Sequence, residues 1–230
     1  MPSRPEPIVA LDLPTFESAR TIVSQLGARA NFYKVGLQLF AAEGPRVVDW
    51  LHAEGKRVFL DLKLHDIPTT VRRAAESSRA LDVALLTVHG LGGEQMVRAA
   101  VEGAGGETGI LVVTILTSMD AAEAGAALGK PLRGLEEEVL RLAGMARASG
   151  AHGVVCGGAE CAAVLADAGA PLRVLVPGIR LTGEGADDQV RMTTPSEASR
   201  AGAAYVVLGR AVTRATDPGA AYERAVAALS

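Results

Sequence analysis

The residues with the clearest potential for chemistry are the charged side chains of the hexapeptide 61–66, with the sequence DLKLHD. The hexapeptide continues an apolar run, residues 58–60, that is typical of a buried strand. Because side chains alternate along a strand, Asp61 and Lys63 are predicted to lie on the same face, with Asp66 just beyond. Ionised groups are rarely placed beside a core without a partner or a task. The sequence therefore predicts a charged reaction site with a carboxylate and an ammonium side by side.

Eight short apolar runs predict the strands that must position this site. They alternate with stretches of helical spacing, such as Phe16–Val23 and Leu135–Ala148. This alternation indicates a parallel sheet with right-handed crossovers. Eight such units in 230 residues fit a (β/α)8 TIM barrel, a single domain over residues 1–230, with a doubly wound open sheet as the alternative. The predicted strands are Ile8–Asp12, Phe32–Gly36, Arg57–Lys63, Val83–His89, Ile110–Leu116, Gly153–Cys156, Leu172–Val176 and Tyr205–Leu208.

Polar groups lie at the predicted ends of several strands, where a barrel of this type carries its working face. A structural layer of ion pairs accounts for one such pair, but two lysines and three aspartates at adjacent strand ends favour a functional site. The groups in or just after these strands are Asp12, Lys34, Asp61, Lys63, Asp66, His89, Thr117, Ser118, Arg180 and Arg210.

The loops after the last two strands predict a phosphate site. Gly178 and Gly209 allow close backbone approach, and Arg180 and Arg210 offer forked donors that suit phosphate oxygens. The segment from Leu181 to Arg191 is rich in glycine and polar residues, which predicts a mobile loop over the site, and Gln189 within it adds an amide donor. A phosphorylated small molecule is the expected ligand.

Composition limits the other possibilities. The net charge of −3 gives no reason to expect nucleic acid or an acidic membrane surface as a partner. Cys156 and Cys161 form neither a disulfide framework nor a metal-ligand pattern, so a reducing, cytoplasmic compartment is the default. Residues 1–7 are expected to be a flexible lead-in, and residues 136–138, three glutamates, a solvated helix face.

The chain resembles the orotidine 5′-monophosphate decarboxylase family, in its short bacterial form, over nearly its whole length. The most specific match is residues 61–70, DLKLHDIPTT. Supporting matches are VALD at 9–12, KVG at 34–36, LTS at 116–118, PGIR at 177–180 and LGRA at 208–211. The resemblance implies a lyase that removes CO2 from orotidine 5′-monophosphate to give uridine 5′-monophosphate, the last step of pyrimidine nucleotide synthesis, with no metal and no organic cofactor.

The resemblance also implies a role for each matching residue. Lys63 donates the proton, Asp61 lies beside the departing carboxylate, and Lys34 and Asp12 orient the ribose and the charge network. Asp66 and Thr70 reach into the partner subunit's site, so the working unit is a homodimer. Ile67 is a further implied substrate contact. Thr117 or Ser118 is implied at the pyrimidine, and Arg180, Gln189, Gly209 and Arg210 at the phosphate.

Two other functions remain open at the level of sequence. Sugar-phosphate decarboxylases and aldolases share the Asp-x-Lys-x-x-Asp core, but the extension through Ile67-Pro68 and Thr70 favours the nucleotide enzyme. A non-catalytic protein that binds nucleotide phosphates would be expected to lack a catalytic lysine or aspartate, and the chain retains them all.

Overall fold

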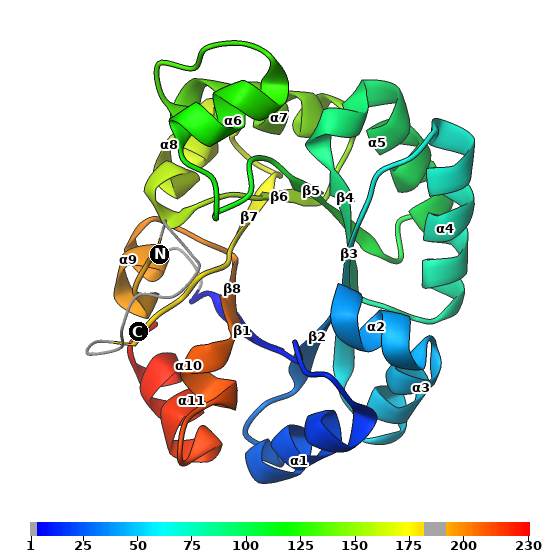
Figure 1. The fold of residues 1–230 in the computed structure, drawn as a ribbon, viewed down its shortest axis with the longest axis vertical. Helices are drawn as coiled ribbons and strands as arrows, with labels where there is room; N and C mark the ends of the chain where they lie inside the picture. The colour runs from blue at the N-terminus through cyan, green and yellow to red at the C-terminus, as the bar shows by residue number, and fades with distance from the viewer. Residues whose placement is uncertain (1–3, 182–191) are drawn as a thin grey trace.

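The computed structural model describes residues 4–181 and 192–230, in which eight parallel strands close into a barrel (Figure 1). Each strand pairs with its neighbour in sequence, and β1 closes the barrel by pairing with β8 from Glu6–Tyr205 to Val9–Leu208. The predicted TIM barrel is confirmed, and the open-sheet alternative is wrong. The strands are β1 Glu6–Ala10, β2 Phe32–Gly36, β3 Arg57–Leu64, β4 Leu85–His89, β5 Gly109–Val113, β6 Gly153–Val155, β7 Arg173–Val176 and β8 Tyr205–Leu208.

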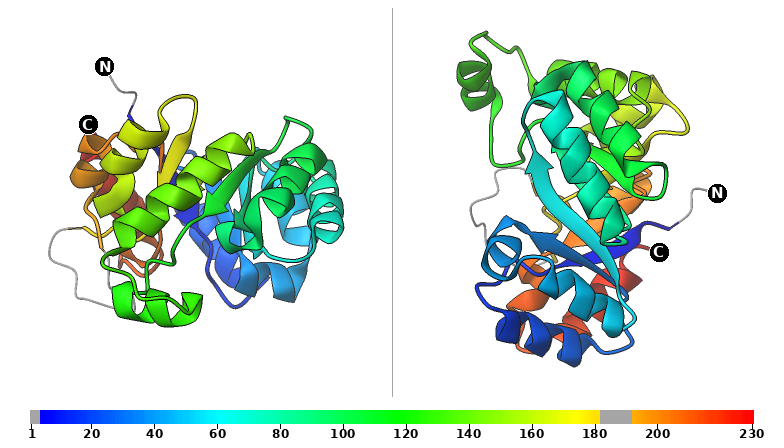
Figure 2. Two further views of the ribbon diagram at one scale, coloured as in Figure 1. Left: turned by 90° about the horizontal axis from the view of Figure 1, so that it is seen from above. Right: turned by 90° about the vertical axis from the view of Figure 1, so that its right-hand side faces the viewer.

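Helices surround the ring of strands, with α6 standing away from the barrel wall (Figure 2). The first helix shows why they pack there, since Ala19, Ile22, Val23 and Leu26 form one buried stripe at helical spacing. The helices are α1 Phe16–Leu26, α2 Leu37–Glu43, α3 Arg46–Ala53, α4 Pro68–Ala80, α5 Gly93–Ala104, α6 Ala121–Leu128, α7 Leu135–Ala148, α8 Gly158–Ala168, α9 Pro195–Arg200, α10 Arg210–Thr213 and α11 Pro218–Ala227, with a 3-10 turn η1 at Gly90–Gly92.

Most predicted boundaries fall close to the observed ones. The predicted bounds of β2, β8 and α7 match exactly those observed. The lead-in was predicted too long, because β1 begins at Glu6 and its pairing with β8 includes Pro7. The predicted loop from Leu181 to Arg191 lies, apart from Leu181, outside the described residues.

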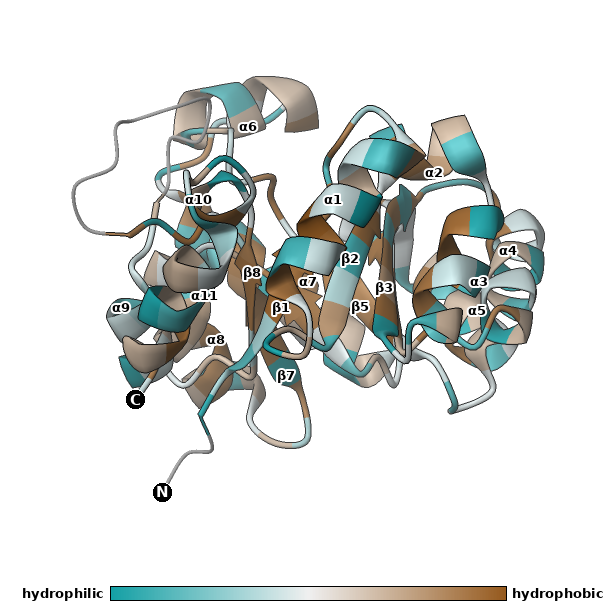
Figure 3. Ribbon diagram, turned by 90° about the horizontal axis from the view of Figure 1, so that it is seen from below, coloured by the Kyte–Doolittle hydropathy of each residue, from teal (hydrophilic) through white to brown (hydrophobic). Residues whose placement is uncertain are grey.

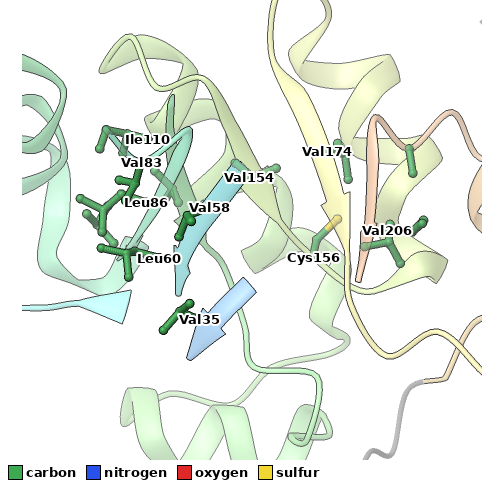
Figure 4. Packing of buried hydrophobic residues seen from close by; sticks show 14 of the residues in the cluster. Val35, Val58, Leu60, Val83, Leu86, Ile110, Val154, Cys156, Val174 and Val206 are labelled. Carbon is green, nitrogen blue, oxygen red and sulfur yellow. The ribbon is translucent and has the colours of Figure 1, made fainter. Parts of the chain in front are cut away.

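Alternation along the strands separates two cores. One lies inside the barrel and includes Ile8, Phe32, Phe59 and Leu85. The other lies between the strands and the helices and includes the valines and leucines labelled in Figure 4. The hydropathy view agrees, with apolar strands at the centre and hydrophilic segments on the outer helices (Figure 3).

The inner core determines where the site lies along the barrel axis. Lys34, Asp61 and Thr87 each lie two residues after an inner-core residue on the same strand, namely Phe32, Phe59 and Leu85. Their side chains therefore form the next inward layer, at the C-terminal end of the barrel.

In the described part of the chain, no helix is both long enough and apolar enough to cross a membrane.

Candidate active site

Four charged side chains form a continuous chain of ion pairs at the C-terminal ends of the first three strands. Lys34 Nζ lies 2.8 Å from Asp12 Oδ1 and 3.2 Å from Asp61 Oδ2. Lys63 Nζ lies 2.8 Å from Asp61 Oδ1. The order Asp12–Lys34–Asp61–Lys63 alternates in sign, so each inner group has an opposite charge on either side.

The inner pair of this chain is the most buried part. The side chains of Lys34 and Asp61 are 8% and 13% exposed, whereas that of Lys63 is 33% exposed. Burial opposes the charge on Lys34, but the carboxylates of Asp61 and Asp12 outweigh it and raise the lysine's pKa. Burial likewise opposes the charge on Asp61, but Lys34 and Lys63 outweigh it and lower the aspartate's pKa. Both groups are therefore charged at neutral pH.

Lys63 reaches this position through an irregular backbone. Its φ of +48° lies in the left-handed region, which a non-glycine residue rarely adopts. The pairing of β3 with β4 shifts register between Leu60 and Leu64, so the strand bulges where Lys63 lies. The predicted meeting of Asp61 and Lys63 is confirmed, although regular alternation alone does not produce it. Strain of this kind often occurs at functional sites.

The charged chain opens into a cavity of about 750 Å³, a size typical of small-molecule sites. Residues from the ends of strands far apart in sequence line it, as predicted for the working face of a barrel. The predicted site residues in the lining are Asp12, Lys34, Asp61, Lys63, Thr117, Ser118, Arg180, Gly209 and Arg210.

The part of the cavity that follows β7 and β8 carries the predicted anion-binding groups. Arg180, Gly209 and Arg210 line it together with Gly178. The backbone here is fixed by pairing, because Arg180 N–H donates to the carbonyl of Thr193 at 3.0 Å and Thr193 N–H donates to Gly178 at 3.3 Å. Arginines that follow two adjacent strands thus line the same cavity, and their forked donors suit a phosphate.

Three predicted site residues lie away from this cavity. Asp66, Ile67 and Thr70 are exposed and do not line it, and the Ile67 side chain is 66% exposed. Asp66 instead accepts a hydrogen bond from the Ile67 N–H at 2.6 Å, just before α4. Gln189 lies outside the described residues.

Sequence reasoning missed several residues at the site. Gln38 and Arg214 line the cavity, and Gly36 allows the close contact of Asp12 with Lys34, since a Cβ at position 36 would lie 2.4 Å from Asp12 Oδ1. Thr87, fully buried in β4, contacts both Asp61 and Lys63. Arg214 had a readable signal, its spacing of four from Arg210. The sequence gives little signal for Thr87, because a threonine among apolar residues is common in a strand.

The two histidines near the hexapeptide form a stacked pair. The rings of His65 and His89 have centroids 5.6 Å apart and planes 22° apart. Burial, then the neighbouring His65 and Lys63, lowers the pKa of His89. Its Nδ1 accepts the Leu91 N–H at 3.3 Å, which agrees with a neutral ring. His89 is thus a hydrogen-bonded residue at the end of β4.

Among residues 4–181 and 192–230, no group of three or more His, Cys, Asp or Glu side chains is arranged to hold a metal ion.

A closed parallel barrel with a charged, phosphate-suited cavity at the C-terminal ends of its strands defines a class of TIM-barrel proteins that bind phosphorylated small molecules. Comparison with known proteins narrows this class. Residues 5–225 match the family described as "Orotidine 5'-phosphate decarboxylase / HUMPS family", and the chain belongs to that family.

Named relatives agree with this membership. An orotidine 5′-phosphate decarboxylase of Anaeromyxobacter dehalogenans is 50% identical over 221 residues, covering 95% of each chain. One of Halorhodospira halophila is 47% identical over 227 residues, covering 96% of this chain and 94% of the relative. The crystal structure of the Lactobacillus acidophilus enzyme of the same name superposes with a TM-score of 0.87 at 37% identity, covering 99% of this chain and 100% of that one.

Proposed function

We infer that this chain is an orotidine 5′-monophosphate decarboxylase, which releases CO2 from its substrate to give uridine 5′-monophosphate, the last step of pyrimidine nucleotide synthesis. The observation that carries this conclusion is the chain of ion pairs Asp12–Lys34–Asp61–Lys63. It opens into a cavity that is also lined by Arg180, after β7, and Arg210, after β8. The named relatives at 50% and 47% identity support the same activity.

The chemistry explains why a charged network is needed. Loss of CO2 leaves a carbanion-like centre with no adjacent carbonyl group to take up the charge. A fixed ammonium stabilises that charge as it develops, without the cost of reorganising solvent. We assign this role to Lys63, which then delivers a proton to the carbon as CO2 leaves. Asp61 keeps the ammonium in place through its 2.8 Å contact and lies beside the departing carboxylate.

We assign the rest of the substrate to the other predicted site residues. We assign the ribose hydroxyls to Asp12 and Lys34, and the pyrimidine to the hydroxyl of Thr117 or Ser118. The phosphate is assigned to Arg210 and Gly209, with Gln189 and Arg180. Binding energy from this distant phosphate contributes to organising the charged network around the reacting carbon.

We propose that the working unit is a homodimer with shared sites. Asp66, Ile67 and Thr70 lie outside their own chain's cavity and are exposed, as expected of residues that complete the site of a partner. Ile67 and Leu91 are also large apolar side chains with 66% and 41% of their surface exposed, which favours burial against another chain. The two-fold symmetry of such a dimer would give each site one set of these residues.

We place the enzyme in the cytoplasm. Both cysteines are buried free thiols, and burial raises the pKa of Cys161 to about 12. Unreactive free thiols suit a reducing compartment.

A comparison of substrates tests the proposed activity. Purified protein is given orotidine 5′-monophosphate, and loss of its ultraviolet absorbance is followed; a parallel sample receives β-keto sugar phosphates and is assayed for CO2. We expect turnover of the nucleotide alone. Turnover of a sugar phosphate without turnover of the nucleotide would instead assign the chain to the other enzymes that share the Asp-x-Lys-x-x-Asp core.

A further inference from the structure

The side chain of Thr87, in β4, forms hydrogen bonds with both Asp61 and Lys63 of β3. Its hydroxyl donates to Asp61 Oδ1 at 2.9 Å. The same hydroxyl oxygen accepts the backbone N–H of Lys63, also at 2.9 Å. Thr87 is fully buried and does not line the cavity, so it acts on the site only through these two neighbours.

The direction of these hydrogen bonds is fixed by chemistry. A backbone N–H can only donate, so the Thr87 oxygen must accept from Lys63. An ionised carboxylate can only accept, so the single hydroxyl proton must point to Asp61. Asp61 Oδ1 then receives two donors, the Thr87 hydroxyl and Lys63 Nζ at 2.8 Å. The carboxylate is thereby held in one orientation between Lys34 and Lys63.

The hydroxyl also replaces a missing part of the sheet. Leu60 pairs with Leu86, and the next pair is Leu64 with Val88, so four residue steps on β3 span two on β4. Lys63 lies in this bulge with its left-handed backbone. Lys63 has no pairing partner on β4 in this bulge, and the Thr87 side chain supplies the acceptor for its N–H.

We propose that Thr87 is a positioning residue of the decarboxylation site, which holds the Asp61 carboxylate and the strained Lys63 backbone in their working geometry with one hydroxyl. This inference rests on the proposed function. If Thr87 has this role, β4 helps to position the proton donor Lys63, in addition to placing His89 near the site.

Thr87→Val tests the proposal, because valine keeps the shape and removes the hydroxyl. Its kcat for orotidine 5′-monophosphate is expected to fall roughly 10- to 100-fold, since a charge-assisted hydrogen bond and an amide acceptor are lost. The KM should change less than about threefold, because no substrate contact is removed. Thr87→Ser, which retains the hydroxyl, should recover most of the lost kcat. If the valine variant does not fold, Thr87→Ala takes its place with the same expectation.

Thr108→Val is the matched control. Thr108 is also a buried threonine, and its hydroxyl donates to the Val83 carbonyl at 2.9 Å, before β5 and away from the cavity. Its kcat should stay within about twofold of wild type even if its melting temperature falls. Equal loss of kcat in both valine variants, a Thr87→Val variant as active as wild type, or a Thr87→Ser variant no better than valine would overturn the proposal. Inactive wild-type protein would instead refute the proposed function.

Discussion

At the scale of single residues, the position of Lys63 depends on its neighbours rather than on regular strand geometry. Its ammonium contacts Asp61 at 2.8 Å, and its backbone is left-handed. Lys63→Ala removes the proton donor, so kcat should fall by roughly 10⁴-fold or more, while uridine 5′-monophosphate still binds. Turnover by absorbance and product binding by calorimetry check the two parts. A variant with a near wild-type rate would remove Lys63 from its role.

Lys56 offers a matched control for that variant. It donates to the carbonyls of Gly27 and Ala30 at 2.7 and 3.1 Å, and it does not line the cavity. Lys56→Ala should therefore reduce stability without a comparable loss of kcat.

Gly36 controls the spacing of the ion pairs. A Cβ there would approach Asp12 Oδ1 to 2.4 Å and Lys34 Nζ to 3.0 Å. These atoms end flexible side chains, so Gly36→Ala should fold but displace both charges and lower kcat at least about tenfold. Steady-state kinetics and circular dichroism check the two parts.

Gly144→Ala separates this effect from a general response to glycine replacement. Gly144 lies exposed within α7, and a Cβ there meets nothing within 4 Å. The control should keep full activity and gain about 0.5–1 kcal/mol of stability, because alanine favours a helix. An unchanged kcat in Gly36→Ala would show that the site tolerates a wider spacing of its charges.

At the scale of helices and strands, a buried carboxylate in α7 stabilises the connection between α6 and α7 through an ion pair. Glu138 is only 3% exposed and pairs with Lys130 at 2.7 Å and Arg141 at 2.5 Å. Its predicted solvated position is wrong, because the chain before α7 folds back and places Lys130 over it. Glu138→Gln should cost about 1 kcal/mol at pH 7, a modest value because both cations are half exposed, measured by urea denaturation.

The pH dependence of this cost has a definite sign. Hydrogen bonding from Arg141, despite burial and with help from Lys130, lowers the pKa of Glu138. The stability that the carboxylate contributes is therefore fully present above the ordinary pKa of glutamate. It is lost as the pH falls through the lowered pKa of Glu138. The stability gap between wild type and Glu138→Gln should shrink with acid, whereas exposed Glu137→Gln should show little gap throughout. A gap that widens with acid would contradict the assigned cause.

The same elements show what the sequence can and cannot predict. The strands, and the placement of Lys34 and Asp61 at their C-terminal ends, follow from patterns in the local residue order, whereas the bulge that brings Lys63 to Asp61 does not. Glu138 is covered by Lys130 from the loop before α7, and Thr87 contacts a bulge in the preceding strand, β3, so neither position has a local signal. Such contacts depend on tertiary register, which no local pattern specifies.

The proposed dimer makes a prediction for the whole molecule. Lys63→Ala and Asp66→Asn chains, each nearly inactive, should regain activity when mixed, because one of the two sites in a hybrid dimer has both groups. Random mixing of equal amounts restores about a quarter of all sites. Activity after co-refolding, with hybrid dimers verified by differently tagged chains, measures this.

A second mixture controls for nonspecific rescue. Asp61 and Lys63 belong to the same site, 2.8 Å apart, so Asp61→Asn and Lys63→Ala chains form no intact site in any dimer. This mixture should remain inactive. Verified hybrids of Lys63→Ala with Asp66→Asn that also remain inactive would exclude sharing of Asp66 across the interface.

The most direct test of the central claim, decarboxylation by the protein's own charged groups, is the rate of orotidine 5′-monophosphate turnover by protein dialysed against EDTA. If the ion pairs of Asp12, Lys34, Asp61 and Lys63 carry out the reaction, the dialysed protein has the same rate as undialysed protein. One uridine 5′-monophosphate is then formed per CO2 released. Absence of turnover, or turnover that returns only when a divalent metal ion is added, would contradict the account.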